Sequence, residues 1–183
     1  MRIALLHHGY GAPGEVRATE RVRALARALR AAGHEPRIVG SRAGRTRRTE
    51  EDGVAVVHLG RLPDGRLRSR GLDSPLTHLP ALLRHLRAAR YEAVHAFSPQ
   101  DAALATRAVG RVVFTPIEPP HRGLLAARRL RLGFWDAATR PPNVVVVADA
   151  AEAEAVSRWL AVDPAMAAAG DAVAHERVYR GLS

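Results

Sequence analysis

The chain has 183 residues, a length typical of one domain, and contains no cysteine. The missing thiols exclude a disulfide scaffold, a thiolate zinc site and a cysteine nucleophile. The 28 basic residues are all Arg and outnumber the 18 acidic ones, so the net charge is +10. Because Ala is also abundant, this charge indicates a compositional bias. With only three Phe, three Tyr and two Trp for base stacking, we expect no specific nucleic-acid partner.

The hydropathy pattern predicts a cytoplasmic protein. No apolar run approaches the roughly 18 residues that a membrane span needs, and the apolar stretch 3–6 is too short for a secretory signal. Residues 122–135 combine Arg with Leu, Phe and Trp, which suits a helix lying on an anionic bilayer. Peripheral contact with the inner membrane surface is one interpretation of this segment. An ordinary helix with a core face and a solvated Arg face is the other.

Apolar periodicity predicts strands that alternate with helices. Strands are expected over residues 3–6, 37–40, 54–59, 93–97, 112–114 and 143–148, and helices over 19–32, 76–89, 101–109, 124–138 and 149–160. The four consecutive valines 144–147 are typical of a strand buried on both faces. Residues 41–52 and 61–75 are expected to be polar surface loops, and the Ala-rich stretch after Asp163 receives no assignment.

This alternation predicts an α/β fold, a Rossmann-like three-layer sandwich with a mostly parallel sheet. We expect one such domain over residues 1–160, followed by a tail over 161–183. Ligands of these folds bind where the carboxyl ends of the strands meet the loops that follow them. The loops after the predicted strands are therefore the candidates for a functional site.

The first of these loops is rich in glycine. Gly9, Gly11 and Gly14 leave room for backbone N–H groups to approach a ligand, and the helix that follows favours an anion. The letters fit G-x-G-x-x-G, but the predicted helix begins only at Thr19, its expected N-cap, and no acidic residue ends the second strand. We therefore expect no dinucleotide cofactor here. A ligand-binding loop and a flexible turn are the two interpretations.

Four segments, in order along the chain, resemble glycosyltransferase family four. Residues 19–36 resemble the first helix and turn of that family, with its Glu-Arg, Leu-Ala-x-x-Leu and Gly-His-Glu elements. Residues 91–96 resemble its Tyr-Asp-Val-Val-His-Ala strand, 144–153 its strand and Ser-Glu-Ala-Glu helix start, and 160–164 its Leu-Gly-Val-Asp-Pro turn. The resemblance implies a single half of a GT-B glycosyltransferase, the N-terminal lobe, which in this family mainly holds the acceptor.

The resemblance also implies an activity. A sugar would pass from a nucleotide-sugar donor to a hydroxyl of a sugar or lipid-linked acceptor, with retention of configuration and without a metal ion. The second lobe, which mainly binds the donor, would begin where residues 161–183 end, so we expect a separate donor-binding partner or a homodimer. Where the family has Gly-Gly before the first helix, this chain has Arg17-Ala18, and Ile117 stands near a position where the family often has His. A non-catalytic binding or regulatory module is therefore the alternative function.

The expected site residues lie after the predicted strands. His95 ends a strand and Glu118 lies between prolines, so we expect these two to be catalytic; a satisfied sheet-end histidine and an ordinary loop carboxylate are the alternatives. Adjacent His7 and His8 should point to opposite faces, so we expect no metal ion between them. The expected substrate-binding residues, with Arg17 as a phosphate clamp, are Gly9, Gly11, Gly14, Arg17, Thr19, Glu20 and Arg122.

Overall fold

The structure, a computed structural model, describes residues 1–63, 74–117 and 129–182. The strands in these ranges form one sheet in the order β3-β4-β2-β1-β5-β6-β7-β8, in which all neighbours are parallel except β3 and β4. The strands are β1 (Arg2–Leu6), β2 (Glu35–Ala43), β3 (Arg47–Glu51), β4 (Val54–Arg61), β5 (Ala93–Ala96), β6 (Val113–Phe114), β7 (Val144–Val147) and β8 (Ala165–Met166).

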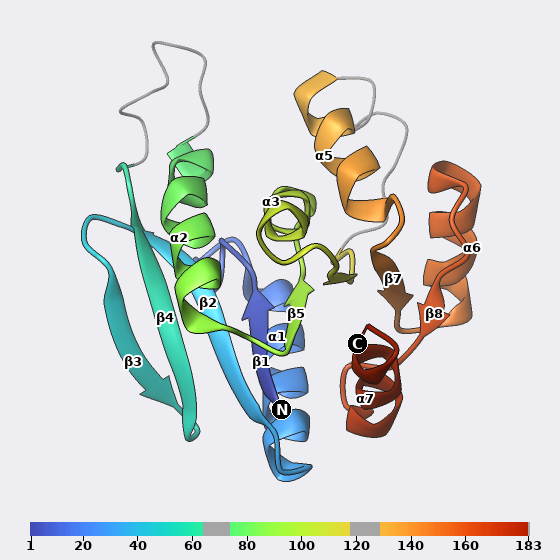
Figure 1. The fold of residues 1–183 in the computed structure, drawn as a ribbon, viewed down its shortest axis with the longest axis horizontal. Coiled ribbons are helices and arrows are strands. Elements are labelled where there is room, and N and C mark those ends of the chain that lie inside the picture. Colours follow the sequence, from blue (N-terminus) through green and yellow to red (C-terminus); the bar gives the residue numbers. More distant parts are fainter. Residues whose placement is uncertain (64–73, 118–128, 183) are drawn as a thin grey trace.

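Helices cover both faces of the sheet (Figure 1). They are α1 (Val16–Ala31), a 3₁₀ helix (Ser74–His78) that leads into α2 (Leu79–Ala89), α3 (Pro99–Val109), α5 (Arg129–Thr139), α6 (Ala150–Leu160) and α7 (Ala172–Arg180). The expected α/β sandwich with a mostly parallel sheet is confirmed.

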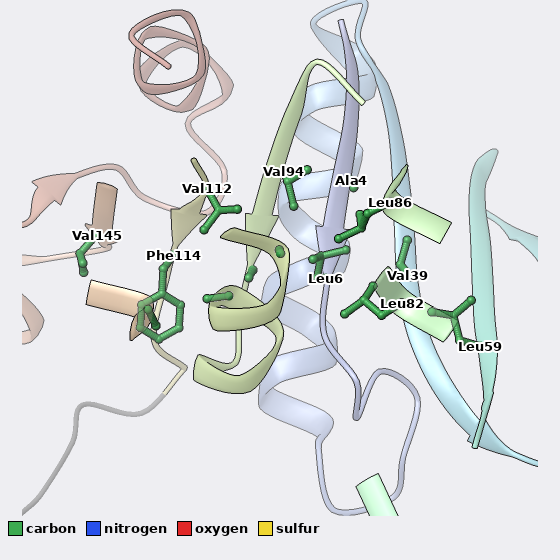
Figure 2. Packing of buried hydrophobic residues seen from close by; sticks show 14 of the residues in the cluster. Ala4, Leu6, Val39, Leu59, Leu82, Leu86, Val94, Val112, Phe114 and Val145 are labelled. Atoms are coloured by element: carbon green, nitrogen blue, oxygen red, sulfur yellow. The ribbon is translucent and has the colours of Figure 1, made fainter. Parts of the chain in front are cut away.

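Two apolar clusters hold the layers together, because successive side chains of a strand point to opposite faces. On one face, Leu5 of β1 packs with Leu25 of α1 and Tyr179 of α7. On the other, Leu6 packs with Leu82 of α2 and with side chains of α3, α5 and α6. Figure 2 shows this second cluster running from α2 across β1 and β5 to β6 and β7. Each fully buried Leu contributes about 2 kcal/mol by leaving water.

Helix α1 begins at Val16, three residues before the predicted start. Thr19 is therefore not the N-cap: that position belongs to Glu15, whose side chain makes no capping hydrogen bond. The predicted stop at Gly33 is confirmed, since this glycine has a φ of +83° and the N–H of His34 reaches back to the carbonyl of Leu29 at 3.0 Å.

The expected polar loop over residues 41–52 was wrong. Strand β2 continues to Ala43, and the chain returns as β3, which pairs antiparallel with β4. Charged side chains such as Arg47, Arg48 and Glu50 hide this strand from a hydrophobic pattern. They are tolerated because β3 is the outermost strand and these three side chains are exposed to water.

The stretch that received no assignment contains β8 and α7. Ala165 of β8 pairs with Val146, and α7 lies against α1 with Tyr179 almost fully buried. These residues extend the same sheet and the same core. The expected boundary at residue 160 stays a prediction.

Residues 129–135 of the basic and apolar segment lie in α5, and their contact with a membrane surface stays a prediction. The Trp135 ring meets the Phe114 ring edge-on, with centroids 5.5 Å apart, so the largest side chain faces the core. Residues 122–128 of that segment, and most of the expected loop 61–75, lie outside the described residues. In the described part of the chain, no helix is long and apolar enough to cross a bilayer.

Candidate functional site

The sheet changes direction between β1 and β5. From β1 the chain continues to β2 on one side, whereas β5 pairs with β1 on the other side, so the loops after these two strands diverge. In open α/β sheets such a switch point, at the carboxyl ends of the strands, is where ligands bind. The loop 7–15 and the start of α3 meet there.

A buried carboxylate joins these two segments. Asp101, in the first turn of α3 and 1% exposed, accepts hydrogen bonds from the backbone N–H of His8 at 2.9 Å and from its ring Nδ1 at 3.2 Å. It also accepts from the Ser98 hydroxyl at 2.7 Å and from Nε2 of His78 at 2.7 Å. One carboxylate thus collects four donors from three separate segments, and it fixes the loop after β1 against α3. We refer to His8, His78, Ser98 and Asp101 as the Asp101 cluster.

The local sequence explains why Asp101 lies here. Ser98 follows β5 in an extended conformation and caps α3, with its Oγ accepting from the N–H of Asp101, and Pro99 occupies the first helical turn. Asp101 then lies at the positive end of the helix dipole, where a carboxylate is favoured. The cap therefore aims the carboxylate into the switch point.

The Asp101 cluster favours an ionised Asp101 and a protonated His8. Burial alone would raise the pKa of Asp101, but the charge and hydrogen bonds of His8 and His78 hold it well below its usual range. Burial likewise disfavours a charged His8, yet the Asp101 carboxylate prevails and raises the pKa of His8 above 6.5. The cluster is thus a carboxylate that supports a readily protonated imidazole.

His8 is oriented for contact with a ligand. Asp101 holds Nδ1, and the opposite nitrogen Nε2 lies 3.2 Å from the amide nitrogen of Gln100. Because that amide nitrogen can only donate, a ligand that accepts a hydrogen bond from Nε2 has to turn or displace the Gln100 side chain. The His8 side chain is 16% exposed. A carboxylate that fixes the tautomer and orientation of an imidazole prepares its second nitrogen to donate a hydrogen bond. Across the described ranges, no group of three or more His, Cys, Asp or Glu side chains is arranged to hold a metal ion.

The glycine loop packs a second histidine. His7 is 3% exposed and its Nε2 lies 3.5 Å from a carboxylate oxygen of Glu15, and this contact lowers the pKa of Glu15. A Cβ on Gly9 would approach Cγ of Glu15 to 2.7 Å and His7 Nε2 to 3.3 Å. Gly9 is therefore needed for the packing of the loop.

Replacing Gly9 by Ala is expected to lower the free energy of unfolding by about 1–2 kcal/mol, because the Glu15 side chain must move off His7. Urea unfolding measures the change. Gly14→Ala is the matched control, since no heavy atom lies within 4 Å of the added methyl group, and we expect a change within about 0.5 kcal/mol. Equal effects of the two substitutions would contradict the role given to Gly9.

The other predicted residues of this loop divide into two groups. Gly11, with a φ of +78°, donates its N–H to the buried Thr19 hydroxyl at 3.0 Å, so Thr19 shapes the loop, and the binding roles of these two residues stay predictions. Gly14, Arg17 and Glu20 are exposed at the start of α1, where they are accessible to a ligand. Their binding roles stay predictions.

His95 does not lie in a cleft. It is fully buried, and its ring nitrogens are taken by the Tyr179 hydroxyl at 2.8 Å and the Thr115 hydroxyl at 2.8 Å. Burial, with smaller contributions from His175 and Arg21, holds its pKa well below 6.5. The structure therefore favours the satisfied sheet-end histidine over the catalytic residue that we expected.

Glu118 and Arg122, the remaining predicted residues, lie outside the described residues. The Asp101 cluster was not predicted from the sequence. Its one local signal is the Ser98-Pro99-x-Asp101 cap directly after a predicted strand, which places a carboxylate at the sheet's carboxyl end.

A depression of about 250 Å³ opens beside the glycine loop. Its walls come from the loop and from the ends of β2 and β4, and they include Tyr10, Gly11, Ser41, Arg42, His58 and Arg61. Tyr10 is anchored by its hydroxyl, which donates to Glu51 at 2.7 Å, while Arg23 binds the same carboxylate at 3.0 Å. Burial, with help from Arg42 and Arg47, lowers the pKa of His58, so that imidazole is neutral at pH 7 and its surroundings are basic.

A mostly parallel sheet that reverses its order at β1 and β5 makes this a Rossmann-like unit, of the kind that forms one GT-B half. Residues 18–168 match the Glycosyl transferase 4-like domain family, and the chain belongs to this family. No curated protein matches the sequence.

Solved structures show the same fold. One chain of sucrose-phosphate synthase from Thermosynechococcus elongatus aligns with a TM-score of 0.64 at 17% identity, over 100% of this chain and 99% of that one. A longer chain of that enzyme gives the same score and identity over 91% of this chain and 46% of its own length. The protein thus spans about half of that longer chain.

Proposed function

We propose that the chain is the acceptor-side lobe of a glycosyltransferase that moves a sugar from a nucleotide-sugar donor to an acceptor hydroxyl. The observation that carries the proposal is the Asp101 cluster, which presents His8 at the switch point of a family-four fold. The proposal includes a second, donor-binding lobe that closes over this side of the sheet.

In this proposal the acceptor and the donor phosphates bind to different parts of the site. The depression between the glycine loop, β2 and β4 has the polar and basic walls that suit a hydroxylated or anionic acceptor. Once the Gln100 amide has turned away from Nε2, the charged His8 ring, supported by Asp101, would donate a hydrogen bond from that nitrogen and stabilise negative charge on a donor phosphate as the sugar leaves. Arg17, exposed on the first turn of α1, would bind the same phosphates.

Replacing His8 by Gln is expected to lower kcat/KM of the assembled enzyme about 10- to 100-fold, because an uncharged amide cannot stabilise the leaving phosphate as an imidazolium does. For the chain by itself, saturation-transfer NMR with a nucleotide sugar should show a weaker signal. His85→Gln is the matched control. His85 lies on α2, away from the switch point, and its Nε2 is hydrogen-bonded to the Tyr91 hydroxyl at 2.9 Å. Unchanged kinetics and binding in the His8 variant would remove it from the site.

The need for a second lobe is tested by co-purification. The tagged chain, recovered from its native cell, is assayed for transfer alone and with any donor-binding chain that accompanies it. Activity that appears only in the pair supports a split enzyme. No transfer in any pairing contradicts the proposal and supports the non-catalytic module, which Arg17-Ala18 in place of the family's Gly-Gly favours.

A further inference from the structure

A second depression lies at the opposite end of the strands, where β1, β2 and β4 begin. Its volume is about 330 Å³, and its walls come from the starts of β1, β2 and β4, the end of α1 and the loop between α2 and β5. We call it the amino-end pocket. Because β1, β2 and β4 are parallel, this pocket at their amino ends lies a strand's length away from the switch point at the carboxyl ends.

Three guanidinium groups line the amino-end pocket. Arg2 comes from β1, Arg30 from the last turn of α1 and Arg37 from β2. Within the described part of the chain, none of the three forms an ion pair. Glu35 is the acidic residue of the lining, so the walls keep a net positive charge.

Some Arg residues elsewhere in the described part of the chain have a carboxylate partner and others have none. Six other guanidinium groups have a carboxylate partner, in the pairs Arg21–Glu152, Arg23–Glu51, Arg27–Asp52, Arg140–Asp136, Arg158–Glu154 and Arg180–Glu176. Others, such as Arg17 and Arg177, form no ion pair within the described residues. Three like charges that share a depression repel one another unless an anion lies between them. The pocket is distinguished by the number of such groups that line one hollow, since Arg2, Arg30 and Arg37 all contribute to its walls.

Two of the three side chains, Arg2 and Arg30, are also held in place. Arg2 donates from Nη2 to the carbonyl of Arg90 at 2.8 Å. Arg30 lies over Gly53, where a Cβ would come within 2.2 Å of Nη1, so this close packing needs the glycine with its φ of +73°. Arg37 lies near enough to Tyr91 for its charge to oppose the rise that burial causes in the pKa of that phenol. Guanidinium groups that are fixed before binding lose less freedom when they bind a ligand.

We propose that the amino-end pocket binds a phosphate-bearing anion. Planar guanidinium groups donate in pairs to phosphate oxygens, and three of them suit a ligand with more than one negative charge. The ligand is either a free phosphorylated small molecule or the headgroup of an anionic phospholipid. The site is separate from the proposed transfer site and needs no second lobe.

Isothermal titration of the full chain with inorganic pyrophosphate, at physiological ionic strength, tests the proposal. Saturable binding of one ion per chain is expected, weakened at least about 10-fold in Arg30→Gln and in Arg37→Gln. Arg158→Gln removes the same charge from an exposed site on α6 and should leave affinity unchanged. The exposed positions of Arg30 and Arg37 should leave thermal unfolding of the variants close to wild type. Absence of saturable binding, or an equal loss in Arg158→Gln, would overturn the site.

Vesicles distinguish the two sources of the phosphate. Co-sedimentation is measured with phosphatidylcholine vesicles that contain or lack phosphatidic acid. Binding to the acidic vesicles that pyrophosphate displaces, and that Arg30→Gln and Arg37→Gln weaken, assigns the pocket to a lipid headgroup. Pyrophosphate binding without vesicle binding assigns it to a free phosphorylated molecule.

Discussion

Replacing Asp101 by Asn is expected to lower the free energy of unfolding by about 3–5 kcal/mol. The carboxylate is buried and accepts four hydrogen bonds, two of them from histidine rings. An amide at this position presents one NH₂ group to those donors and leaves the charge of His8 without a partner. Urea unfolding at pH 7, followed by circular dichroism, measures the loss.

Asp136→Asn is the matched control for this substitution. The Asp136 side chain is 63% exposed and pairs with Arg140 one helical turn away, so we expect a change below about 1 kcal/mol. NMR titration of the imidazoles gives a second measurement, in which the pKa of His8 should fall once the carboxylate is gone. A stable Asp101→Asn protein with an unshifted His8 would show that the cluster is not coupled as described.

Acidification from pH 6.5 to pH 4 is expected to lower the free energy of unfolding by about 3 kcal/mol through His175. This residue of α7 is 2% exposed, and burial lowers its pKa to about 4, although the Ala168 carbonyl and Asp171 favour the charged form. In the unfolded chain its pKa is 6.5, so between these values the unfolded state binds the extra proton. Stability is therefore complete above pH 6.5 and is lost as the pH falls.

His175→Phe should flatten this pH dependence, since the ring is replaced by a neutral one of similar size. His58→Gln should flatten it less, because His58 is only half-buried. The buried His95 adds to the loss at low pH, whereas His8, whose pKa is raised, contributes stability that disappears as the pH rises. Unfolding curves at several pH values measure the slope. A His175→Phe slope equal to that of wild type would contradict the assignment.

The apolar elements were predictable from the sequence, and the charged ones were not. The consecutive valines of β7 predict a buried strand, and the leucines of α2, at helical spacing, predict an amphipathic helix. Strand β3 carries no apolar signal, because its sequence is Arg-Arg-Thr-Glu-Glu. Its extended conformation depends on pairing with β4. In α7 the inward residues are His175 and Tyr179, which a hydrophobic pattern does not mark as core.

The location of the site was predictable, but its chemistry was not. The loop after the first strand follows from the rule for open α/β sheets. The bond between His8 and Asp101 joins residues 93 positions apart, and it depends on how β1 and β5 are aligned, which no local pattern encodes. His95 was misjudged for the opposite reason: its hydroxyl partners, Thr115 and Tyr179, come from distant segments and bury it.

The two outermost strands affect how the protein behaves at high concentration. A sheet that ends in a long, flat, apolar strand is a template for aggregation, since its unpaired backbone groups recruit other chains. Here one side ends in the charged β3, whose Arg and Glu side chains would have to lose water on stacking, and the other ends in β8, which pairs over two residues. Both sides therefore disfavour the growth of a continuous intermolecular sheet, and contacts between molecules are left to side chains.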